Sequence, residues 1–111
     1  MNIIKEMDTD GNLKEIIEEK SKEITAKPPM YLVLLHNDHY TTMEFVIEVL
    51  VQVFHKSASA ATKIMLDVHR KGIGRVGVYT YDIAATKVAQ VRQMAKSAEF
   101  PLKCTIEEET I

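Results

Sequence analysis

The chain lacks several features that define common classes of protein. It has a single cysteine, Cys104, which excludes an internal disulfide and is typical of a reducing compartment. No apolar run approaches the length that spans a membrane, and the start MNIIKEMD introduces charge too early for a secretory signal. From these absences we expect a cytoplasmic protein that does not enter a membrane.

An excess of positive charge is also missing. Lys and Arg total 14 against 16 Asp and Glu, so no broad positive field would attract a phosphate backbone, and nucleic acid is not an expected partner. The length of 111 residues, with 46% hydrophobic and 27% charged, fits one globular domain of ordinary composition. A domain of this size leaves little room for a large active site built from many parts.

Two adjacent prolines, Pro28 and Pro29, divide the chain because they donate no backbone hydrogen bond and disfavour helix before them. Residues 1–27 contain five lysines, seven acidic residues and no aromatic residue. Their few apolar positions could form one weakly amphipathic helix, with too little apolar area to offset the entropy of ordering it. We therefore predict a mobile N-terminal extension over 1–27 and a folded domain over 28–111.

The first elements of that domain follow from hydrophobic periodicity. The apolar run MYLVLL, residues 30–35, indicates a buried strand. The segment TTME then offers a capping box, with Thr41 as N-cap and Glu44 three residues later, for a helix that extends to about His55.

The later elements have equally local signals. A second helix is predicted between a cap at Ser57 or Ser59 and a stop at Gly72. The segment GRVGVYTY alternates as a strand does, and Asp82 can cap a third helix that ends before Pro101. The last strand is indicated by alternating apolar residues: Leu102, Cys104 and Ile106. The order β-α-α-β-α-β predicts a compact two-layer α/β (α+β) domain, a small sheet packed by three helices.

The segment HNDHYT, residues 36–41, must connect the first strand to the first helix, and such loops often carry function. Asn37 and Asp38 could bind a ligand or could stabilise the turn through their own backbone. His69 borders the apolar face of the second helix, where a histidine can be structural or functional. The residues alone leave these alternatives open.

Metal binding and catalysis have weaker support. His36, Asp38, His39 and His69 are permissible zinc ligands by type, but their spacing matches no known zinc motif and no CxxC pair is present. We expect no metal or other cofactor. Cys104 alternates with apolar neighbours as a core residue does, so we expect no nucleophile there.

Four blocks in order resemble the ClpS family: NDHYTTMEFVIEVL, IMLDVHRKG, GVYTYDIAATKVAQV and FPLKCTIE. The resemblance runs from about Pro28 to Glu107 and implies a compact α/β domain after a flexible tail. It also implies a monomeric adaptor, not an enzyme, that delivers N-degron proteins to the ClpAP protease. Such an adaptor binds a first residue that is large and apolar: Leu, Phe, Tyr or Trp. The alternatives are an interaction module of another specificity and, more distantly, a metal-dependent hydrolase.

The resemblance implies roles for three sets of residues. The substrate α-amino group would be bound by Asn37, Asp38, His69 and His39. The hydrophobic pocket would be formed by Thr41, Met43, Val46, Met65, Val68 and Leu102. The N-terminal domain of a ClpA-type AAA+ unfoldase would dock on Asp82 and Lys87, which by their positions alone indicate only a helix cap and an exposed lysine.

These side chains suit that function chemically. An α-amino group is a cation with three donors, so its site needs acceptors and no buried positive charge. Methionine adapts to flat and branched groups, which suits a pocket for both leucine and aromatics. The chain departs from the family at His39, where a second acidic residue is common, and at Thr42, where proline is common. His39 therefore bears on the strength and pH dependence of the amino contact.

Overall fold

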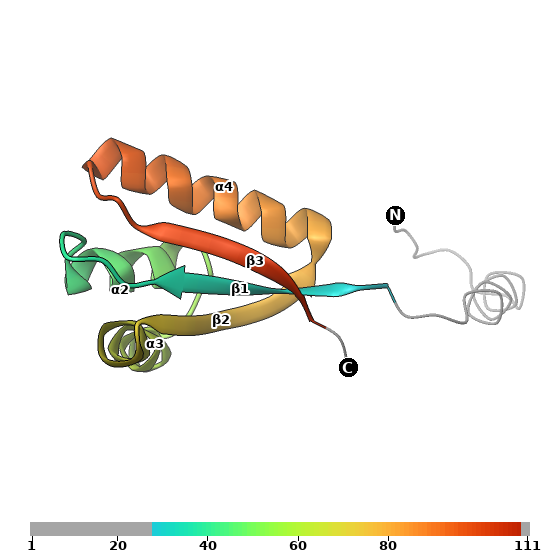
Figure 1. Ribbon diagram of the computed structural model, residues 1–111, viewed down its shortest axis with the longest axis horizontal. Helices are drawn as coiled ribbons and strands as arrows, with labels where there is room; N and C mark the ends of the chain where they lie inside the picture. Colours follow the sequence, from blue (N-terminus) through green and yellow to red (C-terminus); the bar gives the residue numbers. More distant parts are fainter. Residues whose placement is uncertain (1–27, 110–111) are drawn as a thin grey trace, which may run out of the picture.

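The structure is a computed structural model that describes residues 28–109 (Figure 1). Its elements are β1 (Met30–His36), α2 (Met43–Gln52), α3 (Ala58–Lys71), β2 (Ile73–Thr80), α4 (Tyr81–Ala98) and β3 (Lys103–Glu109). This order, with three helices on one small sheet, confirms the predicted α+β fold. The predicted mobile extension, residues 1–27, lies outside the described residues.

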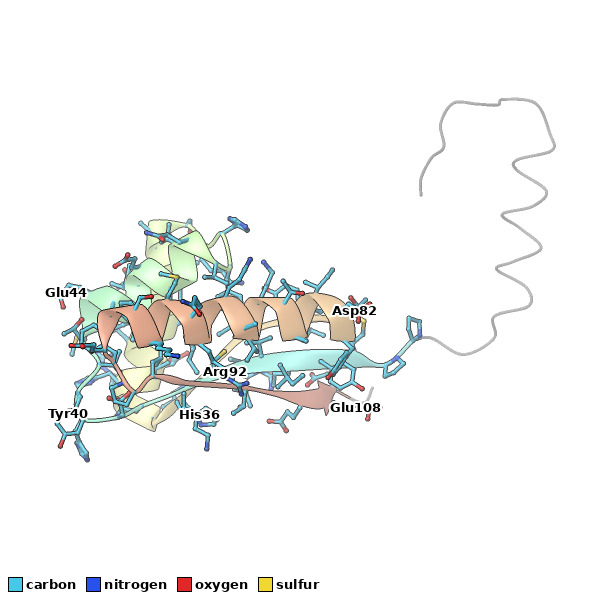
Figure 2. The ribbon with its side chains drawn as sticks, turned by 90° about the horizontal axis from the view of Figure 1, so that it is seen from above. His36, Tyr40, Glu44, Asp82, Arg92 and Glu108 are labelled. Carbon is cyan, nitrogen blue, oxygen red and sulfur yellow. The ribbon has the colours of Figure 1, made fainter. Side chains whose placement is uncertain are left out.

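The central strand of the sheet is β1, which pairs antiparallel with both neighbours in the order β2-β1-β3. It is also strongly apolar, and every residue from Leu32 to Leu35 is buried. Because successive side chains point to opposite faces, Val33 and Leu35 enter the core beneath the helices. Figure 2 shows His36 projecting from the sheet on the side away from α4.

The helix after β1 begins one residue later than the capping pattern predicts. Thr42 is the N-cap of α2, and its hydroxyl accepts the Phe45 N–H at 3.1 Å. The prediction of Thr41 as N-cap is therefore wrong, because the Thr41 hydroxyl is bonded to Asp38 instead. The helix ends at Gln52, before the predicted end at His55.

The ends of α3 agree with the sequence, whereas the start of α4 does not. Ser57 caps α3 by accepting a backbone N–H, and Gly72 ends it with a left-handed φ of 87°. In α4 the N-cap is Thr80, whose side chain makes no capping bond, so the predicted cap at Asp82 is wrong. The strand β2 continues directly into Tyr81, and Asp82 falls in the first helical turn near the positive end of the helix dipole.

The core forms one cluster between the sheet and the helices. Cys104 belongs to it at 1% exposure, as the alternating pattern predicts. Burial raises the pKa of the Cys104 thiol to about 12, so this side chain is neutral and enclosed at neutral pH. Among residues 28–109, no helix is both long and apolar enough to cross a membrane.

Candidate functional site

Asp38 organises the loop between β1 and α2. Its Oδ1 accepts the backbone N–H groups of Tyr40 at 2.8 Å and Thr41 at 2.7 Å, and its Oδ2 accepts the Thr41 hydroxyl at 2.7 Å. Desolvation by burial raises the pKa of Asp38, but these hydrogen bonds outweigh it and the pKa is lowered from its ordinary value. The carboxylate is therefore ionised at neutral pH and fixed in orientation.

The same loop is attached to the end of α3. The Asn37 N–H donates to the Gly72 carbonyl at 3.0 Å. The register that pairs His36 with Ile73 brings these backbone groups together, because the end of β1 lies beside the start of β2. His69, in the last turn of α3, thereby lies near a loop that is about thirty positions away in the chain.

A cavity of about 500 Å³ lies between this loop, the start of α2 and α3. It brings together most residues to which the resemblance gives a site role: Asn37, Asp38, His39, Thr41, Met43, Val46, Met65, Val68 and His69. Among the residues assigned to the amine site and the hydrophobic pocket, Leu102 is the exception, because it is buried in the core and does not line the cavity. The lining also includes residues that had no predicted site role: Tyr40, Thr42 and Glu44. Tyr40 is 76% exposed. It could have been predicted as a site residue, because it is an aromatic residue within a polar loop.

One side of the cavity is apolar and is built by two helices. Val46 of α2 and Met65 and Val68 of α3 are buried and form its inner wall. Met43, the first residue of α2, is 42% exposed and lies at the surface of the cavity. The unbranched side chain of methionine packs against branched and flat groups alike. This side can therefore accept one large apolar side chain.

The other side of the cavity is polar and carries acceptors. Asn37 and Asp38 supply oxygen atoms, and His39 and His69 supply ring nitrogens. Among the described residues that line the cavity, none is Lys or Arg. The two sides together suit a ligand that carries a cationic amine next to a large apolar group.

Comparison with known proteins identifies the family. Residues 26–105 match the family described as ATP-dependent Clp protease adaptor protein ClpS. The ATP-dependent Clp protease adapter protein ClpS of Syntrophus aciditrophicus is 55% identical over 96% of this chain and 94% of its own length. That of Acetivibrio thermocellus is 57% identical over 86% of this chain and 97% of its own length. The chain belongs to the ClpS family.

A solved structure of this family has the same fold. ClpS2 of Agrobacterium tumefaciens, described as bound to L-phenylalaninamide, is 42% identical and superposes with a TM-score of 0.72. The match covers 75% of this chain and 100% of that chain. Membership in the ClpS family makes this protein an adaptor of the Clp protease and not an enzyme. Within the described part of the chain, no group of three His, Cys, Asp or Glu side chains is placed to hold a metal ion.

A separate cavity of about 310 Å³ at the start of α4 includes Asp82 and Lys87. Asp82 is exposed, but the prediction of a freely exposed lysine at Lys87 is wrong. The Lys87 Nζ donates to the Val53 carbonyl at 2.8 Å and lies 5.7 Å from the ring centroids of Phe54 and Tyr79. Because Val53 is the C-cap of α2, Lys87 satisfies a free carbonyl at that helix end and joins α4 to α2.

Proposed function

We propose that this ClpS-family adaptor binds proteins whose free first residue is large and apolar (Leu, Phe, Tyr or Trp) and delivers them to the ClpA unfoldase of ClpAP. One observation carries the proposal: hydrogen-bond acceptors and an apolar wall lie side by side in the same cavity. None of the described residues that line this cavity is Lys or Arg. The L-phenylalaninamide of the solved relative supports it, because that molecule joins an amine to an aromatic side chain.

In this proposal the two sides of the cavity have different tasks. Asn37, Asp38 and His69 accept the three donors of the substrate ammonium, with His39 beside them. Thr41, Met43, Val46, Met65 and Val68 surround the first side chain, and Leu102 supports this wall from the core. Binding requires both groups at once, so an internal leucine, which has no free amine, is rejected.

Delivery requires a second surface, for which we propose the cavity at the start of α4. Asp82 and Lys87 there would contact the N-terminal domain of the unfoldase. Figure 2 shows Asp82 at the opposite end of the domain from Tyr40 and Glu44, so substrate and unfoldase can be bound together. Residues 1–27 would assist the transfer of the substrate.

Fluorescence titration with peptides that differ only in their first residue tests substrate binding. We expect Leu, Phe, Tyr and Trp peptides to bind and Ala, Asp and Lys peptides to bind at least about tenfold more weakly, because burying a large side chain contributes about 1.5–3 kcal/mol. Equal binding of all peptides would reject the proposed specificity.

Acetylation of the peptide amine tests the polar side separately. The acetyl group removes one positive charge and several hydrogen bonds, so binding of a Leu-first peptide should weaken by at least roughly 2 kcal/mol. An acetylated peptide that binds as well as the free one would contradict recognition of the N-terminus.

A further inference from the structure

A second groove, of about 570 Å³, lies between α2 and α4. Its floor is apolar: the rings of Phe45 and Phe100 pack with centroids 4.9 Å apart, and Met94 of α4 lies beside them. Phe100 is held in place because its N–H donates to the Ala95 carbonyl at 2.9 Å, where α4 ends. Phe45 is buried, whereas Met94 and Phe100 are partly exposed, so an apolar group in the groove can contact these two side chains.

The rim of this groove is negative. Glu44 and Glu48 are four residues apart on α2, so they lie on the same side of the helix, and both are exposed. They are the only charged residues among the described residues that line the groove. Glu48 accepts one exposed hydrogen bond, from the Gln52 amide at 3.3 Å, which leaves most of its acceptor capacity open. The groove therefore suits an occupant with a cationic side chain next to an apolar one.

The groove adjoins the cavity proposed for the substrate's first residue. Thr42 and Glu44 line both of them, at the start of α2. An extended chain advances about 3.3–3.6 Å per residue. Four residues of helix rise about 6 Å, so the distance from Glu44 to Glu48 corresponds to about two extended residues. A chain anchored by its first residue can therefore pass over Thr42 and lie along α2 within its next few residues.

We propose that this groove is a subsite for the segment that follows the first residue of the substrate. It favours Lys or Arg near an apolar residue at about the second to fifth positions, and it disfavours Asp and Glu. This inference rests on the proposed function, because the first cavity supplies the anchor. It adds a preference that the first residue does not determine.

The charge preference is tested with Leu-first peptides that are identical except for Lys or Glu at positions three and four. We expect the Lys peptide to bind about two- to fivefold more tightly than the Glu peptide, as for exposed ion pairs, with the ratio shrinking as salt is raised. Glu48→Lys should remove the preference for the Lys peptide, because the rim then carries one anion and one cation, and Glu48 lines the groove and not the first cavity. Glu108→Lys is the matched control, because Glu108 lies at the far end of the domain in Figure 2.

The position of the segment is tested by methionine methyl NMR. Met43 and Met65 report on the first cavity and Met94 reports on the groove. Leucine amide should shift only the Met43 and Met65 resonances, whereas the longer Lys-containing peptide should also shift Met94. An unchanged Met94 resonance with the long peptide, or an unchanged Lys-to-Glu ratio in Glu48→Lys, overturns the subsite.

Other occupants have their own signatures in the same experiment. A Met94 resonance that moves with protein concentration in the absence of peptide would assign the groove to a second copy of the chain and overturn the proposal. If leucine amide fails to shift Met43 and Met65, the proposed function has failed instead. The two failures are therefore distinguishable.

Discussion

The Thr41 hydroxyl donates a hydrogen bond to Oδ2 of Asp38 across 2.7 Å, while Oδ1 of the same carboxylate accepts two backbone N–H groups. Oδ1 is therefore fully used within the loop, and of the roughly four acceptor sites of the carboxylate about one, on Oδ2, is left for a ligand. Thr41 thus acts on the cavity through Asp38 in addition to lining it.

Replacing Thr41 with Val should weaken binding of a Leu-first peptide by about 1–2 kcal/mol, because the Asp38 carboxylate loses a charge-assisted hydrogen bond. Thr41→Ser keeps the hydroxyl and should bind almost as the parent does. Isothermal titration of the three proteins provides the comparison. Weaker binding by the Ser variant together with parent-like binding by the Val variant would show that the methyl group of Thr41 matters, and not its hydroxyl.

The same variant should change the acid titration of Asp38. The folded-state pKa lies below the ordinary 3.8, so ionisation of Asp38 stabilises the fold above that pH and this contribution is lost as the pH falls through the lowered pKa. Thr41→Val should raise the folded-state pKa of Asp38 toward the ordinary value, so the stabilisation by the ionised carboxylate becomes smaller and its loss is complete at a higher pH. Carboxyl NMR from about pH 2 to about pH 6, a range that brackets the ordinary pKa of Asp, measures this directly. An unshifted Asp38 titration would contradict the role of the hydroxyl.

His39→Asp should bind Leu-first peptides more tightly and lose less affinity between pH 7.5 and 5.5. Histidine side chains in general become positively charged as the pH falls from roughly 8 to 5. A cation at this position would repel the ligand ammonium. Aspartate remains an anionic acceptor there, and His69 is unchanged in the comparison. Titrations of both proteins at the two pH values decide the point: matching affinities and slopes would mean that His39 does not face the amine.

The two methionines of the cavity should separate selectivity from stability. Met43→Ala should admit Ile- and Val-first peptides, whose branched Cβ is stiff, because it opens the exposed edge of the pocket. The free energy of unfolding of Met43→Ala should differ from that of the parent by no more than about 0.5 kcal/mol. Met65 is 7% exposed, so Met65→Ala should cost about 2–5 kcal/mol of stability. Peptide titration and denaturant unfolding test both; a Met43→Ala protein that still rejects Ile and Val would contradict its place in selection.

Lys87→Met should destabilise the fold by about 1–3 kcal/mol, because it leaves the Val53 carbonyl without its charged donor. Asp82→Asn should leave stability nearly unchanged, since Asp82 is exposed. Urea unfolding separates these effects from loss of unfoldase binding, which pull-down with a ClpA N-terminal domain measures. Equal stability of the two variants would show that the Lys87 contact contributes little.

Most of the fold could be predicted because its signals are local. The alternation in β2 and β3, the apolar run in β1, and the cap and stop of α3 at Ser57 and Gly72 each depend on residues a few positions apart. The errors were local as well. Thr41 and Thr42 offer the same hydroxyl, and only the Asp38 carboxylate decides which of them caps α2.

The site was less predictable because it joins distant segments. The sequence alone determined that a polar loop would follow the first strand and that His69 would border an apolar helix face. Only the tertiary structure decided that this loop and the end of α3 lie side by side, joined by the hydrogen bond from Asn37 to Gly72. It also decided that Leu102 belongs to the core and that Lys87 donates to the Val53 carbonyl at the end of α2. Periodicity reports which face of an element is apolar, but the packing partner of that face depends on sheet register and helix placement, which no local pattern contains.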